Sequence, residues 1–514
     1  MTSGTLTRDQ AVRDGFAQLV HAEWTKFRTV RGWVIAMIAA AMVIVGLGYF
    51  IASGNVCGSG PFPGQPYTLA CTSPIGPGGE AVTDEFYLVH RPLAGNGSIT
   101  VRVTTLAGVP GTAGLQPWSK AGIIVTEGTR PGSGYAAMMV TGGHGARMQW
   151  DYTQDVAGLA GKVSASNPRW LRLTRDGDTI TGFDSADGTH WTEVGSATLA
   201  GLPTVTQAGL FATSPRPVHG SGFSNTAQVG TGGSEAAGTM DDVSLRGNWP
   251  GSGWTGTEVG AGRNAATAGQ GGFQQAGGAF TVSGSGDIAP AVSGQDTITP
   301  ISQTLVSTFA GLIAVITVAV MFITAEYRRG LIHLSLAASP RRGRLLAAKA
   351  VVIGAVAFAA GLAGAAVTIP LAEHALRRNG NFIAPVSALT ELRVVIGTAA
   401  LLAVAAVMAL AVGAMLRRSA AAVTVLIVVT VLPYLFAVAT PGLPAGPADW
   451  LVEVTPAAAF AIQQTSPQYP QVSDTYAPFF GYYPLAPWAG FAVLCGWAAL
   501  AFALALFLLR RRDA

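Results

Sequence analysis

Residues 394–416 read VVIGTAALLAVAAVMALAVGAML and contain no charged side chain. A helix needs roughly 20 apolar residues to cross about 30 Å of hydrocarbon, and this run is long enough. Similar uncharged runs occur at 33–52, 301–324, 350–371, 419–440 and 487–509. The polar Ser302, Gln303 and Thr304 leave the start of the second run open. We therefore expect a polytopic α-helical membrane protein with six transmembrane helices.

The composition agrees with a chain that lies partly in lipid. Charged residues make up 11% of the 514 residues and hydrophobic ones 49%, with a mean hydropathy of +0.41. A soluble globular protein usually carries about 25% charged residues. A nucleic-acid-binding protein would need a dense basic face, so the composition predicts no nucleic-acid partner.

The distribution of Lys and Arg predicts the orientation, because positive charge flanking a span stays in the cytoplasm. With the N-terminus inside, 16 of the 31 Lys and Arg residues and five of the 27 acids are cytoplasmic. The remaining 15 bases and 22 acids are then outside. Six spans place both termini in the cytoplasm. The cytoplasmic pieces are residues 1–32, 325–349 and 510–514, with a short turn at 417–418.

Residues 53–300 form an extracytoplasmic region too long to be a loop. Short runs rich in β-branched and aromatic residues recur between Gly and Asp turns over about 80–247. This pattern predicts a large all-β sandwich between the first and second transmembrane helices. Residues 248–300 are rich in Gly, Ala and Ser and are expected to be a connector that is at best partly ordered. A second outer segment, rich in proline, spans 441–486.

Motifs for catalysis and metal binding are missing from the sequence. It has no phosphate-binding G-x-x-x-x-G-K-[ST] loop, no G-x-S-x-G and no H-E-x-x-H, and its seven histidines are scattered. We therefore expect no catalytic residue, metal or cofactor on this chain. Cys57 and Cys71 follow the first span on the predicted oxidising side, where they form either a disulfide or two free thiols.

Two cytoplasmic segments combine apolar and basic residues. In the N-terminal segment, Phe16, Val20, Trp24 and Phe27 fall on one face of a helix, which predicts an amphipathic helix at the membrane interface. In 325–349, three leucines lie between two basic clusters, which predicts a short amphipathic helix on the membrane face. The arginines also follow from the orientation rule alone, so on physical grounds both interpretations stay open.

Three segments of the cytoplasmic pieces resemble a known family. AEWTKFRTVR at 22–31, EYRRG at 326–330 and ASPRR at 338–342 resemble the permease subunits of type-2 ATP-binding cassette transporters from high-GC bacteria. The family implies a multi-pass permease of the cell membrane that dimerises with itself or a second permease. It also implies that a separate cytoplasmic ATPase docks on the permease, and that ATP and magnesium bind on that ATPase. His333-Leu334-Ser335 departs from the basic residue and threonines of many relatives.

By position, the resemblance assigns residues to two groups. The residues expected to contact the ATPase are Glu326, Tyr327, Arg328, Arg329, Gly330, Pro340, Arg341, Arg342 and Arg344. The residues expected on the interfacial helix are Glu23, Trp24, Lys26, Arg28 and Arg31. We further expect Glu326 to pair with Arg28 or Arg31.

The outer β region resembles concanavalin-type lectin and glucanase-like sandwiches, through WSKAGI at 118–123, WLRLTR at 170–175 and SADGTHW at 185–191. That family contains sugar binders and glycoside hydrolases, but no E-x-D-x-x-E run is present. The leading hypothesis is an ABC transporter permease, not itself an enzyme, with an outer domain for recognition or gating. The alternatives are a membrane-anchored receptor that binds surface glycan without transport and, less favoured, a membrane-bound glycosidase.

Overall fold

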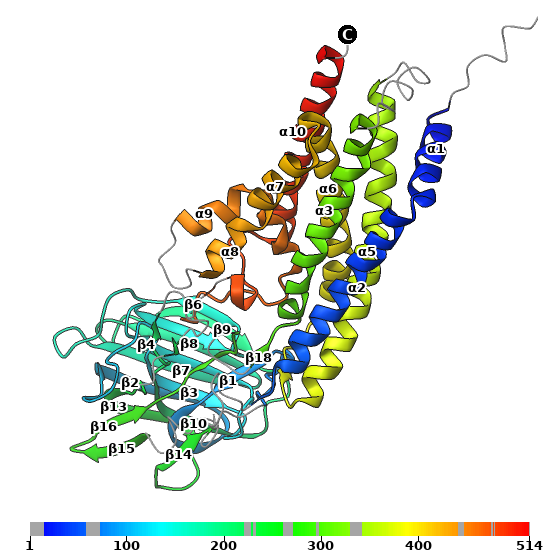
Figure 1. The fold of residues 1–514 in the computed structure, drawn as a ribbon. Helices are drawn as coiled ribbons and strands as arrows, with labels where there is room; N and C mark the ends of the chain where they lie inside the picture. The colour runs from blue at the N-terminus through cyan, green and yellow to red at the C-terminus, as the bar shows by residue number, and fades with distance from the viewer. Residues whose placement is uncertain are drawn as a thin grey trace, which may run out of the picture.

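The computed structural model describes residues 15–57, 72–219, 228–229, 233–260, 271–293, 298–328, 342–439, 447–473, 476 and 478–512. A β domain lies at one end of a bundle of long helices (Figure 1). The helix α1 and the C-terminal end of α10 lie at the opposite end of the bundle (Figure 1). In the text below, this opposite end is called the α1 end.

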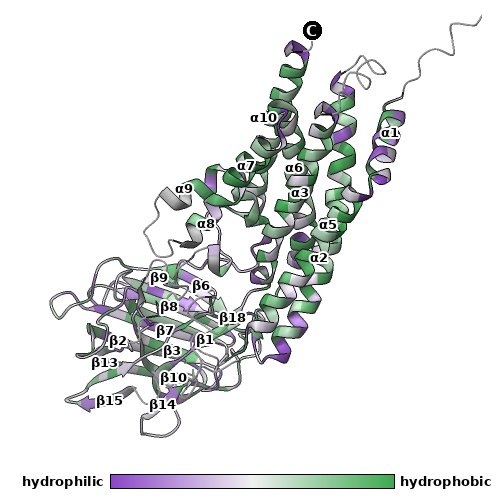
Figure 2. Ribbon diagram, in the orientation of Figure 1, coloured by the Kyte–Doolittle hydropathy of each residue, from purple (hydrophilic) through white to green (hydrophobic). Residues whose placement is uncertain are grey.

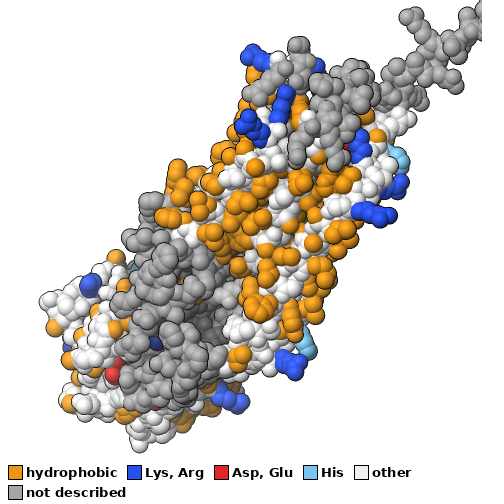
Figure 3. Space-filling view, viewed as in Figure 1, with side chains coloured by type: hydrophobic (Ala, Val, Ile, Leu, Met, Phe, Trp, Pro, Cys, Tyr) orange, Lys and Arg blue, Asp and Glu red, His pale blue; other side chains and the backbone are white. Residues whose placement is uncertain are grey.

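Six helices among the described residues are long and apolar enough to span a membrane. The α-helices are α1 (Phe16–Thr29), α2 (Arg31–Gly54), α3 (Thr308–Arg328), α5 (Arg342–Arg378), α6 (Ala388–Leu416), α7 (Ser419–Thr430), α8 (Leu432–Ala439), α9 (Pro447–Val454) and α10 (Pro487–Arg512). Three 3-10 helices are η1 (Ile301–Ser307), η2 (Pro456–Gln463) and η3 (Pro478–Phe480). Hydrophobic residues dominate the middle of the bundle, and hydrophilic ones gather at its ends and on the β domain (Figure 2). A band of hydrophobic side chains covers the visible helices, with Lys and Arg beyond it (Figure 3).

The helix α6 is at the centre of the bundle, because it packs against α3, α5 and α10. The fifth span, expected over 419–440 with a kink at Pro433, is interrupted next to that proline. It is broken at Val431 into α7 and α8. Pro433 explains the break, because its ring clashes with the carbonyl four residues earlier and it has no N–H to donate. The second span begins as a 3-10 helix, η1, before it continues as α3.

The β domain follows α2 in the chain and precedes η1. Its strands are β1 (Val82–Asp84), β2 (Phe86–Gly108), β3 (Lys120–Thr126), β4 (Tyr135–Thr141), β5 (Ala146–Trp150), β6 (Gln154–Ala157), β7 (Arg169–Asp176), β8 (Thr179–Ser185), β9 (Thr192–Thr198), β10 (Val205–Thr213), β11 (Val218–His219), β12 (Gln228–Val229), β13 (Ala236–Asn248), β14 (Thr255–Val259), β15 (Gly271–Ala276), β16 (Ala279–Gly284), β17 (Ile288–Pro290) and β18 (Ile298–Thr299). A last strand, β19 (Phe382–Ile383), follows α5.

The long strand β2 joins the two layers of the sandwich. Its first half pairs with β10 and β14, and its second half pairs with β7 and β13. The strands β3 and β4 are buried along their whole length, because one face packs on the main core and the other on a smaller core around Phe211 and Tyr152. Such burial on both faces accounts for their uninterrupted apolar sequence.

The region expected to be a connector, 248–300, contributes strands to the β domain. The strand β14 pairs with β2, and β16 pairs with both β13 and β15. The hairpin between β15 and β16 turns at Gly277 and Gly278, whose φ angles are 59° and 85°. Two consecutive positive φ angles suit glycine, so here its abundance marks a tight hairpin. Phe280 and Val282 face the core from β16 and are fully buried.

Several direct contacts attach the β domain to the bundle. The strands β18 and β19 form a parallel pair. Val472 packs against Ala289 and Val292, and the backbone N–H of Ser293 donates to Tyr482 Oη at 3.2 Å. Cys57, just after α2, is disulfide-bonded, while Cys71 lies outside the described residues. The contacts with described partners come from β19, which follows α5, and from the segment between η2 and α10.

Candidate coupling site

Four charged side chains meet where α1 crosses the C-terminal end of α3 and the N-terminal end of α5. Lys349 Nζ donates to Glu23 Oε2 and to Glu326 Oε1, both at 2.6 Å. Lys26 Nζ donates to Glu23 Oε1 at 2.8 Å and to Glu326 Oε1 at 3.3 Å. We call Glu23, Lys26, Glu326 and Lys349 the charge quartet. Its two lysines and two glutamates balance each other.

The charge quartet is largely shielded from solvent. The side chain of Lys349 has no exposed surface, and that of Glu23 is 2% exposed. An isolated charge buried in this way is costly, so each carboxylate here needs a cation within hydrogen-bonding distance. Burial alone would lower the pKa of Lys26, but its contacts with Glu23 and Glu326 outweigh this effect and raise the pKa. Glu326 Oε2 is buried without a hydrogen-bond partner among the described residues.

Aromatic rings surround the quartet and hold α1 against the bundle. Phe27 of α1 is buried and meets Phe322 of α3 edge to face, with ring centroids 5.9 Å apart. Trp33 of α2 meets the same ring at 5.1 Å. Lys349 Nζ lies 4.8 Å from the Phe322 centroid, a cation–π contact. Phe322 and Glu326 are four residues apart and therefore share one face of α3.

Two more contacts link helices at the α1 end. The Arg417 guanidinium, at the left-handed cap of α6, lies 5.0 Å from the ring centroid of Tyr327. Arg342 Nη1 donates to the Leu509 carbonyl at 2.7 Å and so joins α5 to α10. Together with the quartet, these contacts connect α1, α3, α5, α6 and α10. A force applied to α1 or to the end of α3 would therefore reach most of the bundle.

The structure describes some of the residues that are expected to contact the ATPase. Glu326 and Tyr327 lie on the last turn of α3, and Arg342 and Arg344 on the first turn of α5. Arg328 ends α3, and its side chain is not described. Four expected residues lie outside the described residues, together with the expected amphipathic helix: Arg329, Gly330, Pro340 and Arg341.

The interfacial helix differs from expectation in its pairing. Glu23, Trp24, Lys26 and Arg28 lie on α1, and Arg31 begins α2. The expected pairing of Glu326 with Arg28 or Arg31 is wrong, because Glu326 instead pairs with Lys26 and Lys349. Both arginines are exposed. Lys26 precedes Arg28 by two residues, so the two side chains lie on different faces of α1 and only Lys26 reaches Glu326.

Sequence reasoning missed the burial of Lys349, which it assigned to a cytoplasmic loop. A signal was present, since the buried residues of α5 include Leu345, Leu346, Val352 and Ile353. Lys349 is three or four residues from each of them and therefore lies on the same helix face. A lysine on an apolar helix face is buried with its charge, so it predicts an acidic side chain on a neighbouring helix.

A second notable region is the contact between the β domain and the segment from η2 to η3. Asp151 and Tyr152 follow β5 with φ angles of 42° and 62°. Gln471 Nε2 donates to the carbonyls of Tyr152 and Thr153, at 3.4 and 3.1 Å. Burial, together with the charges of Glu80 and Glu127, raises the pKa of Asp151 to about 6. The β domain therefore presents a strained turn to the bundle.

The outer layer of the β domain carries two pairs of arginine and tryptophan. The Arg172 guanidinium lies 3.7 Å from the Trp191 centroid, and that of Arg102 lies 5.6 Å from the Trp170 centroid. All four side chains are half-buried. No cluster of three or more His, Cys, Asp or Glu side chains that could hold a metal occurs among the described residues.

Comparison with known proteins gives one family and several distant structural likenesses. No curated protein matches the chain. A functionally unknown protein from Saccharomyces cerevisiae is 16% identical with a TM-score of 0.23, over 36% of this chain and 88% of that one. The GH43 BlXynB protein from Bacillus licheniformis is 16% identical with a TM-score of 0.18, over 23% of this chain and 24% of its own. Scytalido-glutamic peptidase is 11% identical with a TM-score of 0.24, over 39% and 98%.

Likenesses with such low TM-scores carry no argument about function. The family profile described as "ABC-2 family transporter protein" matches residues 202–514, which is more than half of the chain. The match runs from the later strands of the β domain through α10, and it includes α3 and α5 of the charge quartet. The resemblance to ATP-binding cassette permeases is thereby confirmed at the level of the family. The chain belongs to the ABC-2 family of transporter proteins.

Proposed function

We propose that this chain is the permease subunit of an ABC transporter and that a separate ATPase binds its α1 end. The charge quartet is the observation that carries the proposal, because it fixes α1 to the bases of α3 and α5. Described basic residues outside the quartet add positive charge at this end, among them Arg342, Arg344, Arg417, Arg418, Arg510 and Arg511. The α1 end is then cytoplasmic, in line with the positive-inside rule.

In this proposal the chain supplies motion rather than chemistry. ATP and magnesium bind on the partner ATPase, and its closure displaces α1 and the segment between α3 and α5. Because Lys349 is buried and hydrogen-bonded to the buried Glu23 and Glu326, α1, the C-terminal end of α3 and the N-terminal end of α5 move together. A second permease subunit, either a copy of this chain or another chain, completes the pathway in the plasma membrane. The β domain is then extracytoplasmic and serves in recognition or gating.

Co-purification with an ATPase tests the proposed partner. The paired substitution Arg341→Glu/Arg342→Glu should abolish association with the ATPase and substrate-stimulated ATP hydrolysis. The matched control is Arg377→Glu/Arg378→Glu at the far end of α5. Equal loss in both variants would contradict docking at the α1 end. If the purified protein associates with no ATPase, the transporter assignment fails.

Cysteine labelling tests the orientation. A membrane-impermeant maleimide applied to intact cells should label Lys162→Cys in the β domain and leave His21→Cys in α1 unlabelled. Both positions are exposed, so protein burial does not explain a difference. Labelling of His21→Cys alone would reverse the proposed orientation.

The alternative function is a surface glycan receptor that moves no substrate. The half-buried pairs of Arg172 with Trp191 and Arg102 with Trp170 favour it, because sugars stack on accessible aromatic rings. A glycan array probed with the full-length protein would test this function. Binding that is lost in Trp191→Ala, in a chain that associates with no ATPase, would favour the receptor. Release of reducing sugar would instead favour a glycosidase.

A further inference from the structure

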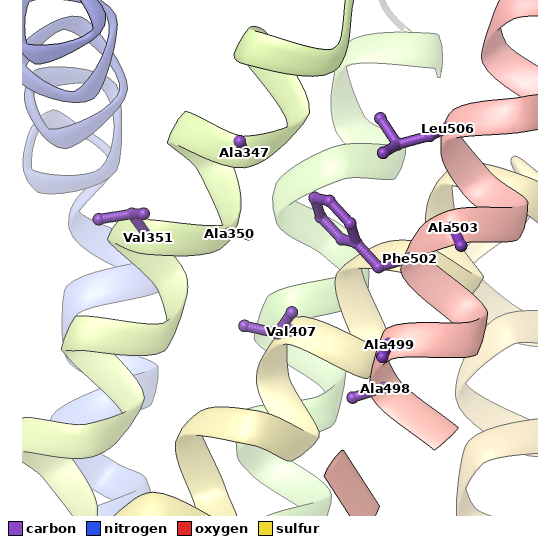
Figure 4. A pocket seen from close by; sticks show the side chains of 9 residues that line it. All are labelled: Ala347, Ala350, Val351, Val407, Ala498, Ala499, Phe502, Ala503 and Leu506. Atoms are coloured by element: carbon purple, nitrogen blue, oxygen red, sulfur yellow. The ribbon is translucent and has the colours of Figure 1, made fainter. Parts of the chain in front are cut away.

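An apolar groove runs between α5, α6 and α10, towards the α1 end of the bundle (Figure 4). It has a volume of about 460 Å³. This volume is within the range of about 300–1,000 Å³ typical of small-molecule sites. Its lining consists of Ala347, Ala350, Val351, Val407, Ala498, Ala499, Phe502, Ala503 and Leu506.

Small side chains create the groove. Five of the nine lining residues are alanines, so the backbones of α5 and α10 are separated by a space that their own side chains do not fill. The lining of α10 extends from Ala498 to Leu506, a rise of about 12 Å along the helix axis. The groove is open to the outside of the bundle, and Val351 and Leu504 beside it are exposed. In a membrane these exposed side chains face lipid tails.

Two arginines lie at the end of the groove. Arg344 precedes Ala347 by three residues and therefore lies on the groove-facing side of α5. Arg510 follows Leu506 by four residues on the corresponding face of α10. Both arginines are exposed and form no ion pair among the described residues. The hydrogen bond from Arg342 to the Leu509 carbonyl holds the two helix ends together at this point.

We propose that an anionic glycerophospholipid binds this groove, with an acyl chain along the alanines and its phosphate between Arg344 and Arg510. The chemistry of the two parts matches the ligand, because the lining offers no polar partner while its end offers two cations. Basic clusters next to membrane helices attract anionic lipids, by about fivefold in affinity for each Arg or Lys. Arg344 also belongs to the residues expected to contact the ATPase, so the lipid is tested on the permease without that partner.

Native mass spectrometry of the full-length protein from nanodiscs tests the inference. The discs contain phosphatidylglycerol and phosphatidylcholine in equal amounts with identical acyl chains. We expect the wild type to retain phosphatidylglycerol about 25-fold over phosphatidylcholine, from about fivefold for each of the two arginines. Arg344→Gln/Arg510→Gln should bring this ratio close to one, while Arg377→Gln/Arg378→Gln at the other end of α5 should leave it unchanged.

A second variant tests the acyl-chain part of the site. Ala503→Phe fills the groove and should reduce retention of both lipids at least threefold while the arginines remain. Ala499→Leu is a smaller change that should act in the same direction if Ala503→Phe does not fold. Unchanged phosphatidylglycerol preference in Arg344→Gln/Arg510→Gln would overturn the proposal. So would displacement of the lipid by inorganic phosphate alone, or a loss of dimer instead of lipid in the groove variants.

Discussion

Lys349 Nζ lies 2.6 Å from Glu326 Oε1, although 23 residues separate the two in the chain and the lysine side chain is wholly buried. The lysine lies at the end of the second turn of α5, and the glutamate lies on the last turn of α3. Their contact therefore fixes the distance between the C-terminal end of α3 and the N-terminal end of α5. Glu23 brings α1 to the same point.

Removal of the buried cation should destabilise the protein. Lys349→Met leaves Glu23 and Glu326 with Lys26 alone, and loss of one partner from a buried ion pair costs about 3–5 kcal/mol. We expect a clear fall in the apparent Tm of the purified protein in detergent. Lys162→Met, on the exposed surface of the β domain, is the control. The triple variant Glu23→Gln/Glu326→Gln/Lys349→Met should be more stable than Lys349→Met alone, since it leaves no buried carboxylate unpaired.

Asp151 should make the stability of the β domain depend on pH. Its pKa is raised from the ordinary value of 3.8 to about 6, by burial first and then by Glu80 and Glu127. The folded state therefore binds this proton more tightly than the unfolded chain, so the contribution of Asp151 to stability falls as pH rises from about 4 to 6. Above pH 6 the full cost of burying the ionised Asp151 carboxylate remains.

The variant Asp151→Asn should remove this dependence. Asparagine also tolerates the positive φ at this position, so the backbone is retained. After allowance for partial exposure we expect a gain of about 1 kcal/mol at pH 7 and none at pH 4. Thermal unfolding of both proteins between pH 4 and 7 measures the difference. A constant difference across this range would contradict the assignment to Asp151.

The sequence predicted the spans better than the contacts between them. The absence of charge over about 20 residues is a local property, and it locates the long helices in the sequence. The break at Val431 lies two residues before Pro433, so the proline marks it in the sequence, whereas the hydropathy pattern alone does not distinguish one helix from two. The burial of Lys349 depends on Glu23, which is 326 residues away in the chain. Such pairing is set by tertiary structure and is not visible in a count of charges by segment.

The β domain shows a different limit. Its central strands have strong alternation or continuous apolar runs and were recognisable. The hairpin of β15 and β16 was not, because Gly and Ala dominate it and only Phe273, Phe280 and Val282 carry the pattern. In this stretch glycine marks a turn and close strand packing, while its abundance elsewhere is typical of flexible linkers.

Gln471 should control the attachment of the β domain to the bundle. The side chain is buried and donates to two carbonyls of the turn after β5, and each hydrogen bond contributes about 1 kcal/mol. We expect Gln471→Ala to accelerate backbone hydrogen exchange in residues 151–156 and to leave the interior of β3 and β4 unchanged. Gln471→Glu should have a larger effect, because it places an acceptor against two acceptors. Gln468→Ala, at a nearby exposed position, is the control.

Two glycines in α2 provide a matched test of helix packing. A Cβ at Gly48 would overlap the methyl group of Thr368 in α5 and lie 3.0 Å from the Thr304 carbonyl of η1. A Cβ at Gly46 would meet no atom within 4 Å. Overpacking of a tight contact costs about 1–3 kcal/mol, whereas an open glycine in a helix gains up to about 1 kcal/mol on change to alanine. Gly48→Ala should therefore lower the apparent Tm and Gly46→Ala should hold or raise it. Equal behaviour of the two variants would mean that α2 does not approach α5 and η1 as closely in the membrane, because only that approach distinguishes the two positions.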